Sequence, residues 1–104
     1  QADIAFLSCR AFRVPGGAFE HSQALTSTKR ALASIAQKKI LLMDYSKWNV
    51  RSLCNSLKLS DLDIIITDNK APLELAAQAA QHGIEILIVN PESNVIQEHF
   101  NPSY

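Results

Sequence analysis

Charged and hydroxyl-bearing side chains follow three apolar runs of the sequence, at the point where each run ends. The carboxyl ends of strands in a parallel sheet share one edge, and ligands bind at that edge. Cations outnumber carboxylates among these side chains, and arginine and lysine pair readily with phosphate or carboxylate groups. The sequence therefore predicts a crevice for an anionic small molecule. Its candidate residues are Arg10 and Arg13 after the first run, Asp44, Ser46 and Lys47 after the second, and Asp68 after the third.

The same residues have a simpler interpretation, which the sequence leaves open. Asp44 and Asp68 could cap turns while the cations lie in solvent, because polar residues at strand ends are common on any α/β protein. Other chemistry has little support. The histidines and cysteines lack the spacing of metal ligands, and the Gly-rich phosphate loops and the GxSxG elbow are absent. We therefore expect no metal and no cofactor.

Length and composition favour one globular domain at most. The 104 residues are 47% hydrophobic and 19% charged, with ten basic and ten acidic side chains. The net charge is zero, so the chain lacks the excess of positive charge that nonspecific binding of nucleic acids requires. Two distant cysteines are typical of reduced thiols, so we expect a cytoplasmic protein. No apolar stretch approaches the roughly 20 residues of a membrane span, and nothing resembles a signal peptide.

The spacing of apolar residues predicts alternating strands and helices. Helices are expected at 21–37, capped by Ser22 or Thr26, and from Pro72 to about His82, with Gly83 as the C-terminal cap residue. Such alternation predicts an α/β fold with a mostly parallel sheet flanked by helices. Continuous apolar strands further predict that both faces of the sheet are covered. The expected strands are 3–9, 40–43, a short one at 53–56, 63–67, and a last one at 84–89.

Three blocks of the sequence resemble the effector-binding domain of DeoR-type bacterial transcription regulators. They are DIAFLSCRAF, STKRALASIAQKKILLMDYSKWN and LSDLDIIITDNKAP, which occur in the order and at the spacing of that family. The resemblance covers residues 3–70. It implies a Rossmann-like fold similar to ribose-5-phosphate isomerase and glucosamine-6-phosphate deaminase.

The resemblance also implies a function outside enzymology. Such regulators bind operator DNA through an N-terminal helix-turn-helix, sense a phosphorylated sugar, control genes of sugar metabolism and commonly form oligomers. By this comparison residues 1–104 are one partial effector-binding domain, its carboxyl-terminal part. The helix-turn-helix and the first half of the sensor domain are expected outside this chain.

The comparison with the isomerases implies binding without turnover. Their two catalytic aspartates fall at Arg10 and Arg13, and their glutamate base falls at Thr28. An arginine cannot abstract a proton at neutral pH. Family members usually carry small residues where the two arginines stand, so the extra cations suggest a more anionic effector, such as a phosphorylated sugar acid.

We therefore expect a non-catalytic sensor of a phosphorylated sugar or sugar acid. Lys47 and Arg10 would hold the anionic group, and Lys29 would reach the same crevice from the helix. Asp44 and Ser46 would position the loop or accept ligand hydroxyls. Two alternatives stay open: an isomerase-like enzyme whose base has moved to Asp44 or Asp68, and an oligomerisation module with a degenerate pocket.

Overall fold

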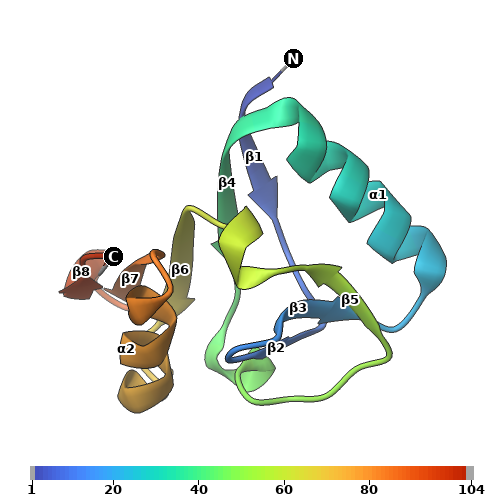
Figure 1. The fold of residues 1–104 in the computed structure, drawn as a ribbon. Helices are drawn as coiled ribbons and strands as arrows, with labels where there is room; N and C mark the ends of the chain where they lie inside the picture. Colours follow the sequence, from blue (N-terminus) through green and yellow to red (C-terminus); the bar gives the residue numbers. More distant parts are fainter. Residues whose placement is uncertain (1, 103–104) are drawn as a thin grey trace.

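The computed structural model describes residues 2–102 and shows a mixed α/β fold (Figure 1). Within these residues, two helices, α1 and α2, accompany eight strands and two short 3₁₀ turns, η1 and η2. The elements in chain order are β1 Ala2–Leu7, β2 Ala11–Arg13, β3 Gly17–Glu20, α1 Gln23–Ile35, β4 Ala36–Leu42, η1 Tyr45–Lys47, β5 Cys54–Leu57, η2 Leu59–Asp61, β6 Ile64–Asp68, α2 Leu73–Gln81, β7 Glu85–Asn90 and β8 Val95–Phe100.

The larger sheet has five strands in the order β1-β4-β6-β7-β8. The first four run parallel, as the alternation of elements predicted, and β8 pairs antiparallel with β7. The prediction that 84–89 is the last strand was wrong. A turn over 91–94 reverses the chain, with Asn94 at φ 57° and its N–H donating to the Asn90 carbonyl at 2.9 Å. Strand β8 is exposed along most of its length, so its sequence has no clear apolar alternation.

A second, antiparallel sheet of three strands has the order β2-β3-β5. The sequence analysis did not predict the hairpin of β2 and β3, which a turn at Pro15 and Gly16 closes. Gly17 opens β3 at φ 104°, where a Cβ atom would lie 2.2 Å from the Leu57 carbonyl oxygen. Only glycine fits this close approach of two strands. The short strand expected near 53–56 exists as β5 and belongs to this second sheet.

Both helices begin as the sequence predicted. The Ser22 hydroxyl accepts a hydrogen bond from the Leu25 N–H at 3.2 Å and caps α1. Pro72 precedes α2, and Gly83 follows it at φ 89°. Helix α1 ends two residues earlier than expected, because β4 begins directly at Ala36 with no connecting loop.

The core lies on one face of the five-stranded sheet. Register places Leu7, Leu41 and Ile65 side by side, and all three are buried. The same hydrophobic cluster contains the alanines on the buried side of α2 and residues of the three-stranded sheet, and Ala33 of α1 packs against it. Phe12 and Trp48 also belong to this core, and their rings meet edge to face with centroids 5.1 Å apart.

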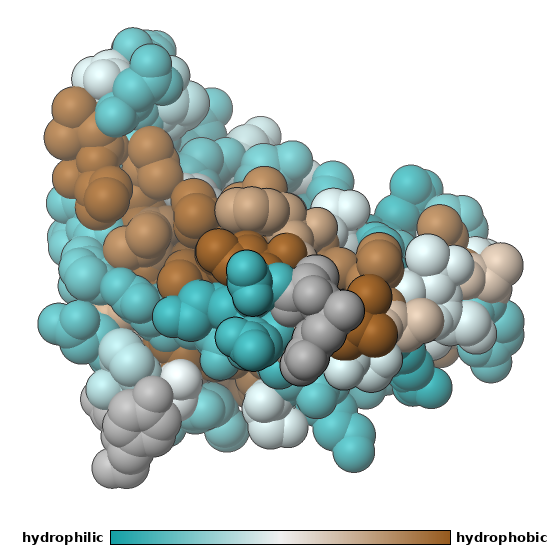
Figure 2. Space-filling view, turned by 90° about the horizontal axis from the view of Figure 1, so that it is seen from above, coloured by the Kyte–Doolittle hydropathy of each residue, from teal (hydrophilic) through white to brown (hydrophobic). Residues whose placement is uncertain are grey.

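No described element covers the opposite face of the sheet. Phe6 is 63% exposed, Ile4 48% and Leu42 43%. Seen from above, hydrophobic residues form a broad area on the surface of the molecule (Figure 2). The expectation that both faces are covered is therefore wrong for residues 2–102. We call this surface the open face; by register it comprises Ile4, Phe6, Ile40, Leu42, Ile64, Ile66, Leu87 and Val89, of which Ile40 is buried at 8% exposure.

Candidate functional site

The carboxyl ends of β1, β4 and β6 meet at one edge of the sheet, as predicted. The Met43 N–H donates to the Ile66 carbonyl at 3.1 Å, which continues the pairing beyond β4. The Cys9 thiol lies 3.8 Å from the Met43 sulfur. Segments from three separate strand ends are thereby fixed against one another.

A hollow of about 410 Å³ opens at this edge. We call it the strand-end hollow; its lining residues are Ser8, Cys9, Arg10, Glu20, His21, Leu25, Lys29 and Lys47. Three of the seven predicted site residues, Arg10, Lys29 and Lys47, therefore lie around one cavity. They come from the end of β1, from α1 and from η1.

Lys29 is tied to the protein on three sides. Its ammonium donates to a Glu20 carboxylate oxygen at 2.8 Å and to the Ser8 carbonyl at 2.6 Å, and it lies 3.4 Å from the Ser8 hydroxyl. The side chains are 14% and 3% exposed for Lys29 and Glu20. A lysine ammonium has three N–H donors, so these acceptors use all of them.

The other two cations of the strand-end hollow are more available. The Lys47 ammonium is 3.8 Å from an Asp44 oxygen, and its side chain is one-third exposed. The Arg10 backbone N–H donates to the Phe19 carbonyl at 3.0 Å, which fixes the main chain there. Within residues 2–102 the exposed Arg10 guanidinium has no hydrogen-bond or ion-pair partner. Two cations can therefore meet a ligand without first leaving a buried partner.

The predicted acids hold the loop in place. Asp44 accepts hydrogen bonds from the Ser46 hydroxyl and, at 2.8 Å, from the Ser46 N–H. Those bonds lower the pKa of Asp44, with the hydroxyl as the largest cause. Asp68 accepts from the Tyr45 and Lys70 N–H groups, both at 3.1 Å. Asp44, Ser46 and Asp68 are not among the residues that line the strand-end hollow.

Arg13 lies at the end of β2, away from the strand-end hollow. The hairpin turns its part of the chain into the three-stranded sheet, where Arg13 pairs with Gly17. Sequence reasoning placed the residue in the crevice because it did not anticipate this hairpin.

Cys9 lines the strand-end hollow as a neutral thiol. Burial is the main cause that raises its pKa from 9.0 to about 12, and the Glu20 charge adds to it, while Lys29 and Lys47 act in the opposite direction. A thiol in this state is a poor nucleophile.

Glu20 is the functional candidate that sequence reasoning missed. It ends β3 in the otherwise apolar segment GAFE, and its carboxylate is buried beside the hollow. The sequence held one faint signal: an isolated acid stands just before the capping serine of a helix that carries Lys29. Ser8 and His21, which also line the hollow, had no signal of their own.

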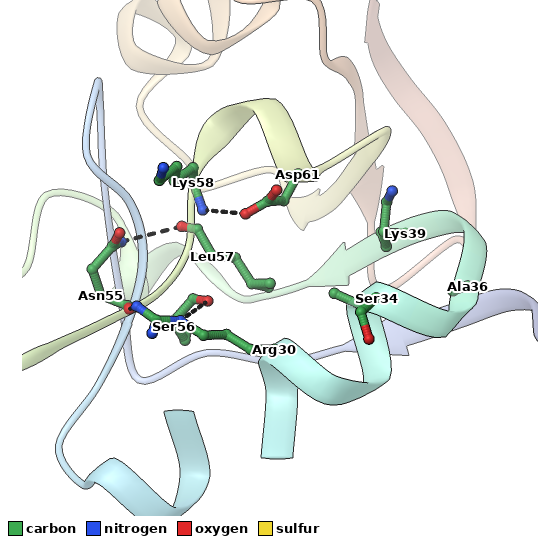
Figure 3. A pocket seen from close by; sticks show the side chains of 10 residues that line it. Arg30, Ser34, Ala36, Lys39, Asn55, Ser56, Leu57, Lys58 and Asp61 are labelled. Atoms are coloured by element: carbon green, nitrogen blue, oxygen red, sulfur yellow. Dashed lines mark hydrogen bonds between the residues drawn. The ribbon is translucent and has the colours of Figure 1, made fainter. Parts of the chain in front are cut away.

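A second hollow of about 560 Å³ lies between α1, β5 and η2 (Figure 3). Its Arg30 guanidinium is bound to the Asn55 and Ser56 carbonyls at 2.6 and 3.3 Å. The side chains of Lys39 and Lys58 extend in different directions. This larger hollow therefore lacks cations that converge on one point, and the strand-end hollow is the better candidate.

Residues 2–102 contain neither a cluster of metal ligands nor a membrane-spanning helix. That part of the chain contains no group of three or more His, Cys, Asp or Glu side chains placed to hold a metal ion. Neither described helix is long and apolar enough to cross a membrane.

Comparison with known proteins decides the family. The model of the DeoR C-terminal sensor domain matches residues 1–69. The chain belongs to the DeoR family. This confirms the resemblance seen in the three sequence blocks. The strand-end hollow therefore lies in a sensor domain of a family whose relatives are named as transcriptional regulators.

Relatives of this DeoR sensor chain are named as regulators. The chain is 30% identical over 87 residues to the HTH-type transcriptional regulator GolR of Listeria innocua, covering 84% of this chain and 34% of that protein. It is 32% identical to an uncharacterized HTH-type transcriptional regulator of Haemophilus influenzae, again over 84% of this chain and 34% of the relative. The regulator YgbI of Escherichia coli is 29% identical over 86% of this chain and 35% of its own length. The chain thus spans about a third of these relatives, none of which is named as an enzyme.

Proposed function

We propose that this DeoR-family chain senses a phosphorylated sugar or sugar acid and does not convert it. The observation that carries the proposal is the placement of Arg10 and Lys47 around one hollow at the carboxyl edge of a parallel sheet. Cations from two separate strand ends suit a phosphate group, which both side chains recognise. Asp44 and Ser46 support the site by fixing η1, the turn that carries Lys47.

The state of the acids supports binding without turnover. Thr28, at the position of the isomerase base, is exposed, and its hydroxyl donates to the Ala24 carbonyl at 3.0 Å. Asp44 and Asp68 both accept hydrogen bonds from the loop, and a lowered pKa makes Asp44 a weaker base. Glu20 is paired with Lys29. Glu20 is therefore the one acid among residues 2–102 that lines the hollow, and Lys29 holds it as an ion pair.

The open face supports the view that these residues are part of a larger sensor domain. Parallel sheets are normally covered on both faces, and here apolar side chains such as Phe6 stay in solvent. The curated relatives are about three times as long as the matched segment. We infer that further segments of the same regulator cover this face, that the complete domain is Rossmann-like and akin to ribose-5-phosphate isomerase, and that it functions as an oligomer.

Coupling to DNA follows from the same proposal. A helix-turn-helix outside residues 1–104 would contact the operator, and ligand binding would shift the regulator between two states of different DNA affinity. A ligand can do so only if it binds one state more tightly than the other.

Binding measurements on the intact protein test the proposal. We expect a panel of aldose phosphates to contain a ligand detectable by calorimetry, and the Lys47→Met variant to lose at least about tenfold in affinity. Lys58→Met is the matched control, because it removes the same charge from the other hollow. Equal affinities for wild type and Lys47→Met would contradict the assignment, and turnover of the ligand would contradict the sensor function.

A further inference from the structure

Glu20 places a carboxylate oxygen on a hollow that is otherwise lined by cations. Its Oε2 atom is paired with Lys29 at 2.8 Å. Its Oε1 atom has no hydrogen-bond partner among residues 2–102. In the same part of the chain, every fully buried side-chain nitrogen or oxygen has a partner, so Oε1 keeps accessible surface. The Glu20 side chain is only 3% exposed and lines the strand-end hollow, so this unpaired acceptor lies at the wall of the hollow.

Lys29 has a different part from the other two cations of the hollow. All three of its donors are directed to Glu20 and Ser8. It therefore fixes one oxygen of the Glu20 carboxylate, and its own donors are occupied by protein acceptors. Arg10 and Lys47 remain as the charges that a ligand can reach.

The distribution of charge gives the hollow two unlike regions. Two available cations match a phosphate monoester, which carries a charge of about −1.5 to −2 at neutral pH. The free Glu20 oxygen can only accept, so a ligand hydroxyl would bind to it as a donor. A second carboxylate on the ligand would meet a like charge there, and like charges in a shared site repel strongly.

We propose that Glu20 is the specificity-determining residue of the strand-end hollow, and that it selects a sugar monophosphate with a neutral, hydroxyl-bearing end over the corresponding phosphorylated sugar acid. The proposal rests on the proposed sensor function and narrows it. Arg13 is not among the residues that line the hollow, so its charge gives no reason to expect a more anionic effector.

The test compares matched pairs of aldose phosphates and phosphorylated aldonic acids, with inorganic phosphate as the common fragment. Calorimetry on the intact protein should show that wild type prefers the aldose phosphate of a pair. Glu20→Gln keeps an acceptor oxygen and removes the charge, so the preference should fall at least about tenfold, chiefly through tighter binding of the acid. Asp61→Asn is the matched control, because it makes the same change of charge in the other hollow.

A joint replacement guards against misfolding. Glu20→Met together with Lys29→Met removes the ion pair as a unit, and it should lower the preference as Glu20→Gln does. If ligands bind and neither variant changes the ratio of affinities, Glu20 does not set specificity and the sensor function stands. If wild type binds none of the sugar phosphates, sugar acids or phosphate, both the sensor function and the role of Glu20 are refuted.

Discussion

The buried ion pair of Glu20 and Lys29 should be far more costly to break than to remove. At 2.8 Å and an effective dielectric constant of 20, the attraction between the charges is roughly 6 kcal/mol. Desolvation of each ion costs several kcal/mol, so the net contribution of the pair to the free energy of unfolding is small. Lys29→Met would leave a carboxylate 3% exposed without its cation. We expect that variant to lose about 3–5 kcal/mol of stability.

The two single variants should differ because the two partners differ in their surroundings. Glu20→Met leaves an ammonium that is 14% exposed and still bound to the Ser8 carbonyl, so its cost should be about 1–3 kcal/mol. The double variant replaces the pair by apolar side chains and should lie within about 1–2 kcal/mol of wild type.

Equilibrium unfolding in urea measures these differences. Trp48 is the only tryptophan of the chain and is 5% exposed, so its fluorescence reports on the core. The double-mutant cycle should give a coupling of at least about 2 kcal/mol. Additive single effects, or a Lys29→Met variant as stable as wild type, would refute the reasoning that Lys29 compensates a buried charge.

Three further outcomes can be measured in the same way. Gly17→Ala should lower the free energy of unfolding by about 3 kcal/mol or more, because φ is 104° and the new Cβ would lie 2.2 Å from a backbone oxygen. The matched variant Gly16→Ala, whose Cβ would meet only side-chain atoms, should lower it by about 1 kcal/mol. Because burial raises the pKa of Cys9 from 9.0 to about 12, the folded state keeps the thiol protonated at a pH where the unfolded state loses the proton. The resulting contribution to the free energy of unfolding is present in full below pH 9 and should fall by roughly 4 kcal/mol at most as the pH rises toward 12. Cys9→Ala should abolish this dependence of stability on pH. In the 104-residue chain, Leu41→Ala removes a fully buried side chain and should lower the free energy of unfolding by about 2–5 kcal/mol. Phe6→Ala changes a side chain that is 63% exposed and should lower it by less than about 1 kcal/mol. Equal losses of stability would show that the open face is covered.

Local patterns in the sequence were sufficient for the parallel strands and the helix starts. Apolar runs identified β4 and β6, and Ser22 identified the start of α1. Long apolar runs and capping residues are local signals, and they do not depend on distant partners. The strand ends that carry Arg10 and Lys47 could be predicted for the same reason.

The remaining features depend on contacts between distant segments. The β2–β3 hairpin is joined to β5 through β3, and Arg13 lies in this hairpin, paired with Gly17. Strand β8 is held by β7 and has no apolar pattern of its own. Glu20 became a candidate only when the fold placed it 2.8 Å from Lys29. No single stretch of sequence encodes these arrangements.

The direct junction of α1 and β4 has a mechanical consequence. Helical residue Ile35 is followed at once by strand residue Ala36, so no flexible linker absorbs a change in the tilt of the helix. Lys29 anchors α1 at the hollow, and the far end of β4 leads into the turn that holds Lys47. Because both elements lead to the strand-end hollow and are joined without a loop, we expect a shift of α1 to be accompanied by a shift of β4.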